Sequence, residues 1–212
     1  MSGRQPVLNS DIQNPPSAYN KAVFYRAVNM SGEQDNGAAV VVGRLNPPTR
    51  GHGILIRQLK ETAQRLGARP ILYIVDGEKS SQDKVKNPLT GNQRLQLARK
   101  LFPGITVDVV ASAYEALEVL DLQGFELKAW IAGSDRASNY RKLVASEHLD
   151  CEVFEVDREA GEADGVSATA ARQAACSGDM EAFAHHMPDL QPDDLADIAR
   201  MIREAHNGIN TR

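Results

Sequence analysis

The sequence has only two cysteines, Cys151 and Cys176, and they lack the close spacing of metal-binding pairs. A disulfide framework is therefore not expected, and a reducing compartment is the default. Residues 1–30 contain no basic segment followed by an apolar core, so no secretory signal peptide is predicted. No apolar run approaches the ~20 residues that a membrane span needs. These absences favour a cytoplasmic protein.

The chain also lacks a surplus of positive charge. Its 24 Lys and Arg residues face 28 Asp and Glu residues, which gives a formal net charge of −4 over 212 residues. A general nucleic-acid-binding protein usually presents a basic face, so this balance argues against one. It leaves room for a small basic pocket that holds a nucleotide. The length predicts one domain with an added arm.

Residues 1–37 differ in composition from the rest of the chain, because they are rich in Asn, Ser, Gln, Pro and Gly. Such a composition favours irregular backbone. We therefore expect an N-terminal arm over residues 1–37, a core over 38–178 and a C-terminal helical extension over 179–212. The arm is either a loose tail or a segment that docks on another subunit or partner.

Apolar and amphipathic segments alternate from residue 38 onward. Strands are expected at 38–42, 70–75, 105–110, 127–133 and 151–156. Helices are expected between them at 51–66, 90–102, 112–123 and 137–148, and beyond them at 167–177, 179–186 and 192–206. Continuous apolar strands that alternate with helices are typical of a parallel sheet covered on both faces. The sequence therefore predicts an α/β fold with a Rossmann-like, parallel five-stranded sheet.

The stretch GRLNPPTRGH, residues 43–52, follows the first expected strand and runs directly into a helix. An open parallel sheet binds ligands at the carboxyl ends of its strands, and the first strand usually lies where the strand order reverses. Gly43 allows a ligand to approach the backbone closely. Pro47 and Pro48 stiffen the loop, and Thr49 suits the N-cap of the helix.

Gly51 and His52 then fall in the first turn of that helix, whose free N–H groups attract phosphate. We expect His52 to form a hydrogen bond with an anion that lies over the helix start. Arg44 adds a permanent positive charge with a bidentate geometry.

This loop resembles the one that carries the H/T-x-G-H signature in the nucleotidyltransferase superfamily. That superfamily includes nicotinamide mononucleotide and phosphopantetheine adenylyltransferases and cytidylyltransferases. The Asn-Pro-Pro-Thr form is most similar to small cytidylyltransferase-like proteins of bacteriophages, and Thr49 stands where many members have the first histidine. The resemblance implies that His52 is catalytic. The nucleotide-binding residues that it implies in this loop are Gly43, Arg44, Asn46, Thr49 and Gly51.

Three further stretches are similar to the same superfamily, in the same order. GVSATAAR, residues 165–172, resembles its I-S-S-T-x-x-R signature, although Ala168 replaces the second serine. This similarity implies that Ser167 caps a helix aimed at the outer phosphates and that Thr169 belongs to the same nucleotide site. It also implies that Arg172 reaches the triphosphate as a catalytic group.

AGSDR, residues 132–136, resembles the family's G-x-D, which implies that Gly133 and Asp135 face the nucleotide and that Asp135 accepts a ribose hydroxyl. KVKNPLTGNQR, residues 84–94, resembles a basic loop that leads into a helix. It implies that Lys86 is a mobile catalytic contact to phosphate.

The resemblance implies transfer of a nucleotidyl group from ATP or CTP to a phosphorylated small-molecule acceptor, with release of pyrophosphate. Mg²⁺ is the implied cofactor, and the triphosphate and water would hold it, since the sequence shows no carboxylate cluster as a metal site. The acceptor stays open between nicotinamide mononucleotide, phosphopantetheine, and sugar or polyol phosphates. Trp130, the only tryptophan, is expected in the core rather than against the acceptor.

Two other interpretations compete with this one. A class I aminoacyl-tRNA synthetase shares the first motif, but GEKSSQD, residues 77–83, comes too early to be its second signature. The alternative is a nucleotide-binding or structural phage-particle protein without turnover, whose arm over 1–37 links neighbouring copies. A phage origin would place the protein in the host cytoplasm or the virion.

Overall fold

The computed structural model describes residues 36–157 and 165–210, so nearly all of the arm predicted over 1–37 lies outside the described residues. The elements in chain order are β1 (Gly37–Gly43), α2 (Arg50–Leu66), β2 (Arg69–Val75), α3 (Glu78–Gln82), α4 (Gly91–Leu101), β3 (Thr106–Val110), α5 (Ala113–Leu122), β4 (Glu126–Gly133), α6 (Ser134–Ser146), β5 (Glu152–Val156), α7 (Ala168–Ser177), α8 (Met180–His186) and α9 (Pro192–Asn210). The alternation of strands and helices is the expected one, and the predicted α/β, Rossmann-like fold is confirmed.

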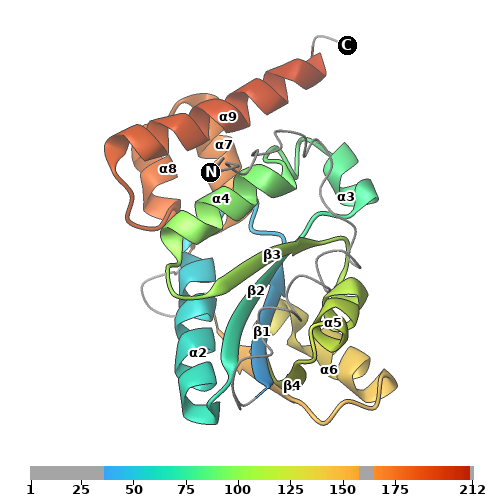
Figure 1. The fold of residues 1–212 in the computed structure, drawn as a ribbon. Coiled ribbons are helices and arrows are strands. Elements are labelled where there is room, and N and C mark those ends of the chain that lie inside the picture. Colours follow the sequence, from blue (N-terminus) through green and yellow to red (C-terminus); the bar gives the residue numbers. More distant parts are fainter. Residues whose placement is uncertain (1–35, 158–164, 211–212) are drawn as a thin grey trace, which may run out of the picture.

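The sheet has five strands in the order β3-β2-β1-β4-β5, and all four neighbouring pairs are parallel. β1 is therefore the central strand (Figure 1). The chain builds outward from β1 to β3 on one side and then continues with β4 on the other side. This reversal puts the switch point of the sheet, where such folds bind ligands, between the carboxyl ends of β1 and β4.

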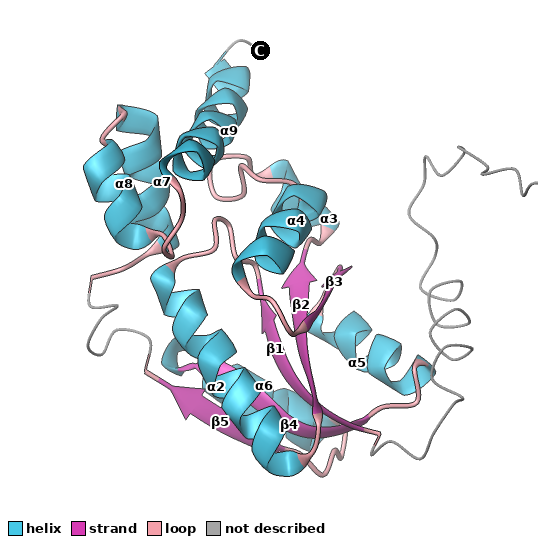
Figure 2. Ribbon diagram, turned by 60° about the vertical axis from the view of Figure 1, so that its left-hand side comes forward, coloured by secondary structure: helices cyan, strands magenta, loops and turns pink. Residues whose placement is uncertain are grey.

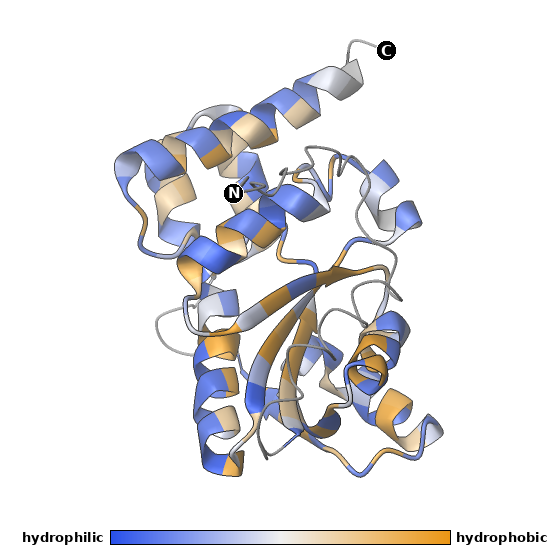
Figure 3. Cartoon of the chain, viewed as in Figure 1, coloured by the Kyte–Doolittle hydropathy of each residue, from blue (hydrophilic) through white to orange (hydrophobic). Residues whose placement is uncertain are grey.

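Two hydrophobic clusters cover the two faces of the sheet, because alternate residues of β1 point to opposite faces. Val40 and Val42 belong to the cluster that includes residues of α5 and α6, whereas Val41 belongs to the one that includes residues of α2 and α4. Figure 3 shows the apolar residues concentrated in the strands. Trp130 is fully buried in the first cluster and stacks on Tyr140 with 4.5 Å between ring centroids, so its predicted place in the core is confirmed.

A third hydrophobic cluster joins α7, α8 and α9 and includes Leu89 from the segment that precedes α4. Figure 2 shows these three helices grouped at one end of the molecule. Phe183 of α8 and Ile202 of α9 are among its buried residues. α7 thus packs with α8 and α9. The division of the chain after residue 178 stays a prediction.

Two elements depart from the expected pattern. α6 begins at Ser134 rather than near residue 137, because Gly133 takes an extended N-cap conformation and Asp135 in the first turn complements the helix N-terminus. The polar segment after β2 contains the short helix α3 instead of being entirely a loop. Within the described residues, no helix combines the length and apolar character that crossing a membrane requires.

Candidate active site

The loop between β1 and α2 fixes the orientation of His52. The backbone N–H of Thr49, the N-cap residue, donates to Nδ1 of His52 over 3.0 Å, and the Thr49 hydroxyl lies 2.8 Å from the same nitrogen. A ring nitrogen that accepts an N–H bond carries no proton. Neutral His52 therefore has its proton on Nε2, which makes that nitrogen a hydrogen-bond donor at the start of α2.

Asn46 anchors the middle of the same loop. Its side chain is 3% exposed, and its amide group donates to the Leu89 carbonyl over 2.9 Å and accepts from the Leu89 N–H over 3.1 Å. The side-chain amide of Asn46 is thus engaged with Leu89. The preceding residue, Leu45, takes a positive φ of 47°, and the Asn46–Pro47 peptide bond is cis.

We expect the substitution Asn46→Ala to lower the free energy of unfolding by at least about 2 kcal/mol. It leaves the N–H and the carbonyl of buried Leu89 without these partners, and each such group costs about 1–3 kcal/mol. Urea unfolding measures the change, with Asn139→Ala, an exposed position on α6, as the control. A loss within about 0.5 kcal/mol for both variants would contradict this assignment.

Arg172 of α7 reaches across to the loop. Its Nη1 donates to the Asn46 carbonyl over 2.7 Å, and its Nη2 donates to the Thr169 hydroxyl over 3.0 Å. Burial lowers the pKa of Arg172, and the nearby charge of Arg44 lowers it further. An arginine nevertheless stays protonated in a protein, so two guanidinium charges lie close together here.

Ser167 and Lys86 frame the same region. The Ser167 hydroxyl accepts from the Ala170 N–H over 3.0 Å and so caps α7 as predicted. The Lys86 ammonium lies 3.3 Å from a carboxylate oxygen of Asp83, and hydrogen bonding by the Lys86 backbone holds the pKa of Asp83 below its usual value. The Lys86 side chain is 69% exposed. Exposed ion pairs of this kind are weak, so Lys86 can leave Asp83 for a stronger anion.

All twelve residues proposed from the sequence line one cavity of about 1390 Å³. They are Gly43, Arg44, Asn46, Thr49, Gly51, His52, Lys86, Gly133, Asp135, Ser167, Thr169 and Arg172. They come from four separate stretches of the chain, and the fold brings these together at the carboxyl ends of β1 and β4, on the start of α2 and on α7. Their roles toward a ligand stay predictions.

The Cytidylyltransferase-like family matches residues 40–174 of the 212-residue chain. The chain belongs to the cytidylyltransferase-like family. The match covers all four motif stretches, and it supports the predicted membership of the nucleotidyltransferase superfamily. The particular likeness to phage proteins stays a prediction.

A solved structure described as a macrolide-efflux protein from Streptococcus pneumoniae has a similar fold, with a TM-score of 0.50 and 16% sequence identity. The likeness covers 70% of this chain and 54% of that one, so the cytidylyltransferase-like chain spans about half the length of that protein. At this identity the likeness concerns the fold alone. No curated protein matches the sequence.

The charges around the cavity of this cytidylyltransferase-like protein are mostly positive. Among the described residues, its lining includes one carboxylate, that of Asp135. The cationic side chains in the lining are those of Arg44, Lys84, Lys86, Arg136 and Arg172. Such an excess attracts a polyanion such as a triphosphate. No group of three or more His, Cys, Asp or Glu side chains in the described part of the chain forms a metal site.

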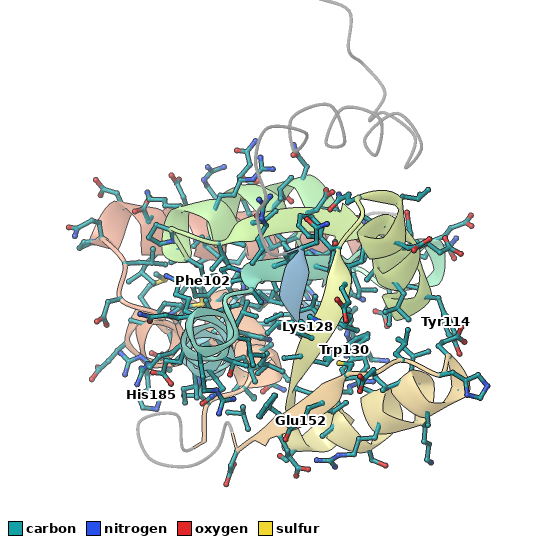
Figure 4. All side chains as sticks on the ribbon, turned by 60° about the horizontal axis from the view of Figure 1, so that its bottom comes forward. Phe102, Tyr114, Lys128, Trp130, Glu152 and His185 are labelled. Atoms are coloured by element: carbon teal, nitrogen blue, oxygen red, sulfur yellow. The ribbon has the colours of Figure 1, made fainter. Side chains whose placement is uncertain are left out.

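The sequence did not single out several residues that shape this site. Val85 and Tyr114 line the cavity although they are exposed, and Figure 4 shows Tyr114 at the periphery. Ile202 and His206 of α9 also line it, so the predicted C-terminal extension contributes to its wall. These residues could not be recognised from the sequence, because an exposed apolar side chain or one face of a helix indicates a binding site only after the fold places it beside a cavity.

Proposed function

We propose that this protein transfers a nucleotidyl group from an NTP, ATP or CTP, to the phosphate of a small-molecule acceptor and releases pyrophosphate. The observation that carries the proposal is the gathering of all twelve motif residues around one cation-rich cavity. An oxygen of the acceptor phosphate attacks the α-phosphorus, and the bond between that phosphorus and the bridging oxygen to the β-phosphate breaks. A phosphate is already ionised at neutral pH, so catalysis consists mainly of positioning and charge stabilisation.

His52 is the group that we assign to the reacting phosphate. Because Thr49 accounts for Nδ1, Nε2 is the ring nitrogen that would donate to an α- or β-phosphate oxygen. The start of α2 adds backbone N–H groups and the positive end of the helix dipole.

Arg172 and Ser167 take the outer phosphates, since Ser167 caps the start of α7, Arg172 lies in its second turn and both line the cavity. Arg44 adds a further cation near Arg172. Lys86 exchanges its exposed partner Asp83 for the leaving pyrophosphate. Together they offset the charge that builds up on the leaving group.

Mg²⁺ suits this site only as an ion carried by the triphosphate, because Asp135 is the single carboxylate among the described lining residues. When bound, it would neutralise phosphate charge. The residues of this chain then hold the phosphates, orient the α-phosphorus and limit the access of water.

The acceptor has room beside the apolar part of the cavity wall. Five large hydrophobic residues are exposed in the described chain, and two of them, Val85 and Tyr114, line the cavity. Lys84 and Lys86 flank Val85 in sequence and also line the cavity. This combination of charge and apolar surface supports an acceptor that carries both a phosphate and a less polar part.

Pyrophosphate release over a panel of nucleotides and acceptors tests the proposed function. The panel crosses ATP, CTP, GTP and UTP with nicotinamide mononucleotide, phosphopantetheine, and sugar and polyol phosphates, each with Mg²⁺. We expect release with at least one pair, and release that is about 10²–10³-fold slower with His52→Ala at the same enzyme concentration. Nucleotide binding without release from any pair would instead favour a nucleotide-binding or structural protein.

We further expect Mg²⁺-dependent binding in which a triphosphate is preferred over its monophosphate by at least tenfold in Kd, about 1.4 kcal/mol. The reason is that the cationic groups assigned here, Arg44, Lys86 and Arg172, all act on phosphates and only Asp135 on the sugar. Calorimetry with ATP against AMP, and CTP against CMP, measures the preference. Equal affinities within both pairs would contradict the assignment.

A further inference from the structure

Arg94 of α4 is a fully buried cation that no part of the mechanism above uses. It is 1% exposed and is not among the residues that line the cavity. A buried charge is costly unless it is paired and its donors are satisfied. Arg94 meets both conditions, and the identity of its partners shows what the charge does.

The guanidinium of Arg94 joins the ends of two strands. Its Nη1 donates to the carbonyl of Arg44, directly after β1, over 2.5 Å, and to the carbonyl of Val75, the last residue of β2, over 2.9 Å. Its Nε donates to the Thr90 carbonyl over 3.3 Å. Arg94 thus ties the carboxyl ends of β1 and β2 to the start of α4.

Asp76 holds the guanidinium in this position. One carboxylate oxygen lies 2.5 Å from Nη2 of Arg94, and the other accepts from the Gly91 N–H over 2.9 Å. A Cβ atom at position 91 would collide with this carboxylate, which explains glycine there. Asp76 therefore compensates the positive charge of Arg94. The positive charges of Arg44 and Arg172 instead belong to the lining of the cavity.

We propose that Arg94 is a positioning residue for the nucleotidyl transfer: through the carbonyl of Arg44, it fixes the beginning of the loop that carries Arg44 and leads to His52 at the start of α2. The inference rests on the proposed function. Without the bond from Arg94, the repulsion between neighbouring cations and the pull of a bound anion would displace the Arg44 peptide. A planar guanidinium reaches all four acceptors at once, and a lysine ammonium does not.

Arg94→Lys tests the proposal because it keeps a positive charge but removes the planar guanidinium group and its several N–H donors. We expect kcat to fall by about 10- to 100-fold, as small misplacements in an active site do, with a smaller change in KM for the NTP. Two controls separate positioning from stability. Arg99→Lys alters another arginine of α4 that donates to a carbonyl, that of Val107, outside the cavity lining. Val107→Ala destabilises the buried face of the sheet in β3, two strands away from β1 and outside the cavity lining.

The decisive measurement repeats Arg94→Lys in a His52→Ala background, since Arg44→Ala would leave the carbonyl that Arg94 bonds in place. If Arg94 acts by holding the loop that places His52, its substitution costs less than about threefold in kcat there, because the two changes affect one unit. The same loss in both backgrounds would overturn the proposal, as would an unchanged kcat for Arg94→Lys. An equal loss for Val107→Ala at a matched melting temperature would also overturn it.

Amide hydrogen exchange provides a test that needs no turnover. We expect Arg94→Lys to speed exchange within residues 43–50, while Arg99→Lys leaves this segment unchanged. A wild-type protein that releases no pyrophosphate from any substrate pair would refute the proposed function, and the exchange measurement would still decide the role of Arg94. Equal exchange in wild type and Arg94→Lys would refute that role.

Discussion

Replacing His52 with alanine is expected to lower kcat by about 10²–10³-fold, with a much smaller rise in KM for the nucleotide. This is the usual loss when one preorganised donor to a charged transition state is removed. The Thr49 N–H donates to Nδ1 of His52 and so fixes the neutral tautomer in which Nε2 is the donor. The expected loss of kcat therefore reflects the removal of a hydrogen-bond donor and does not depend on His52 gaining or losing a proton. Steady-state pyrophosphate release at saturating acceptor measures it.

The matched control is His185→Ala, because His185 lies on α8 at the periphery of the molecule (Figure 4) and outside the cavity lining. It is expected to leave kcat unchanged. Both variants should unfold within about 1 kcal/mol of the wild type. A His52→Ala protein that turns over normally but melts far lower would show that His52 only supports the start of α2.

Arg172→Ala is the second substitution with a large expected effect. It removes a guanidinium that lies half-buried against the loop, and we expect kcat to fall by about 10²–10³-fold. Arg172→Lys should recover little of this loss, because one ammonium cannot contact the Asn46 carbonyl, the Thr169 hydroxyl and a phosphate in the geometry of a fork. The same pyrophosphate assay gives kcat and KM for both variants.

Arg203→Ala serves as the control for Arg172. Arg203 on α9 also donates to a backbone carbonyl, that of Ala175, but it does not line the cavity. It is expected to affect the melting temperature and not the turnover. The His52→Ala/Arg172→Ala double variant should lose less than the product of the single losses, since both groups hold one triphosphate chain. Multiplicative losses would mean that the two residues act independently.

The architecture was predictable from local patterns. Continuous apolar strands such as 38–42 and 127–133, separated by amphipathic helices, indicate a covered parallel sheet, and the structure has it. The gathering of the motif residues at one cavity was predictable for a related reason. The loop after the first strand must lie at the carboxyl edge, and the capping serine of α7 and the arginine one turn later follow from a short sequence pattern.

Other features depend on contacts between distant residues and could not be read in this way. Nothing near Asn46 indicates that its side chain is engaged by Leu89, 43 residues later. Asp76 and Arg94 look like surface charges in a polar stretch, and only the fold reveals that they form a pair in which Arg94 is fully buried. The contribution of α9 to the cavity likewise depends on how the third hydrophobic cluster docks.

That third cluster has a consequence for how the protein holds together. α7, α8 and α9 share their own apolar core with Leu89, and polar bonds such as Arg172 to Asn46 and Arg50 to Met187 connect them to the body of the sheet. A triphosphate gripped by His52 on one side and Arg172 on the other would act as a cross-link between two separately packed units. Ligand binding would then raise the free energy of unfolding with concentration. The melting temperature of the protein would therefore rise with the concentration of the bound nucleotide.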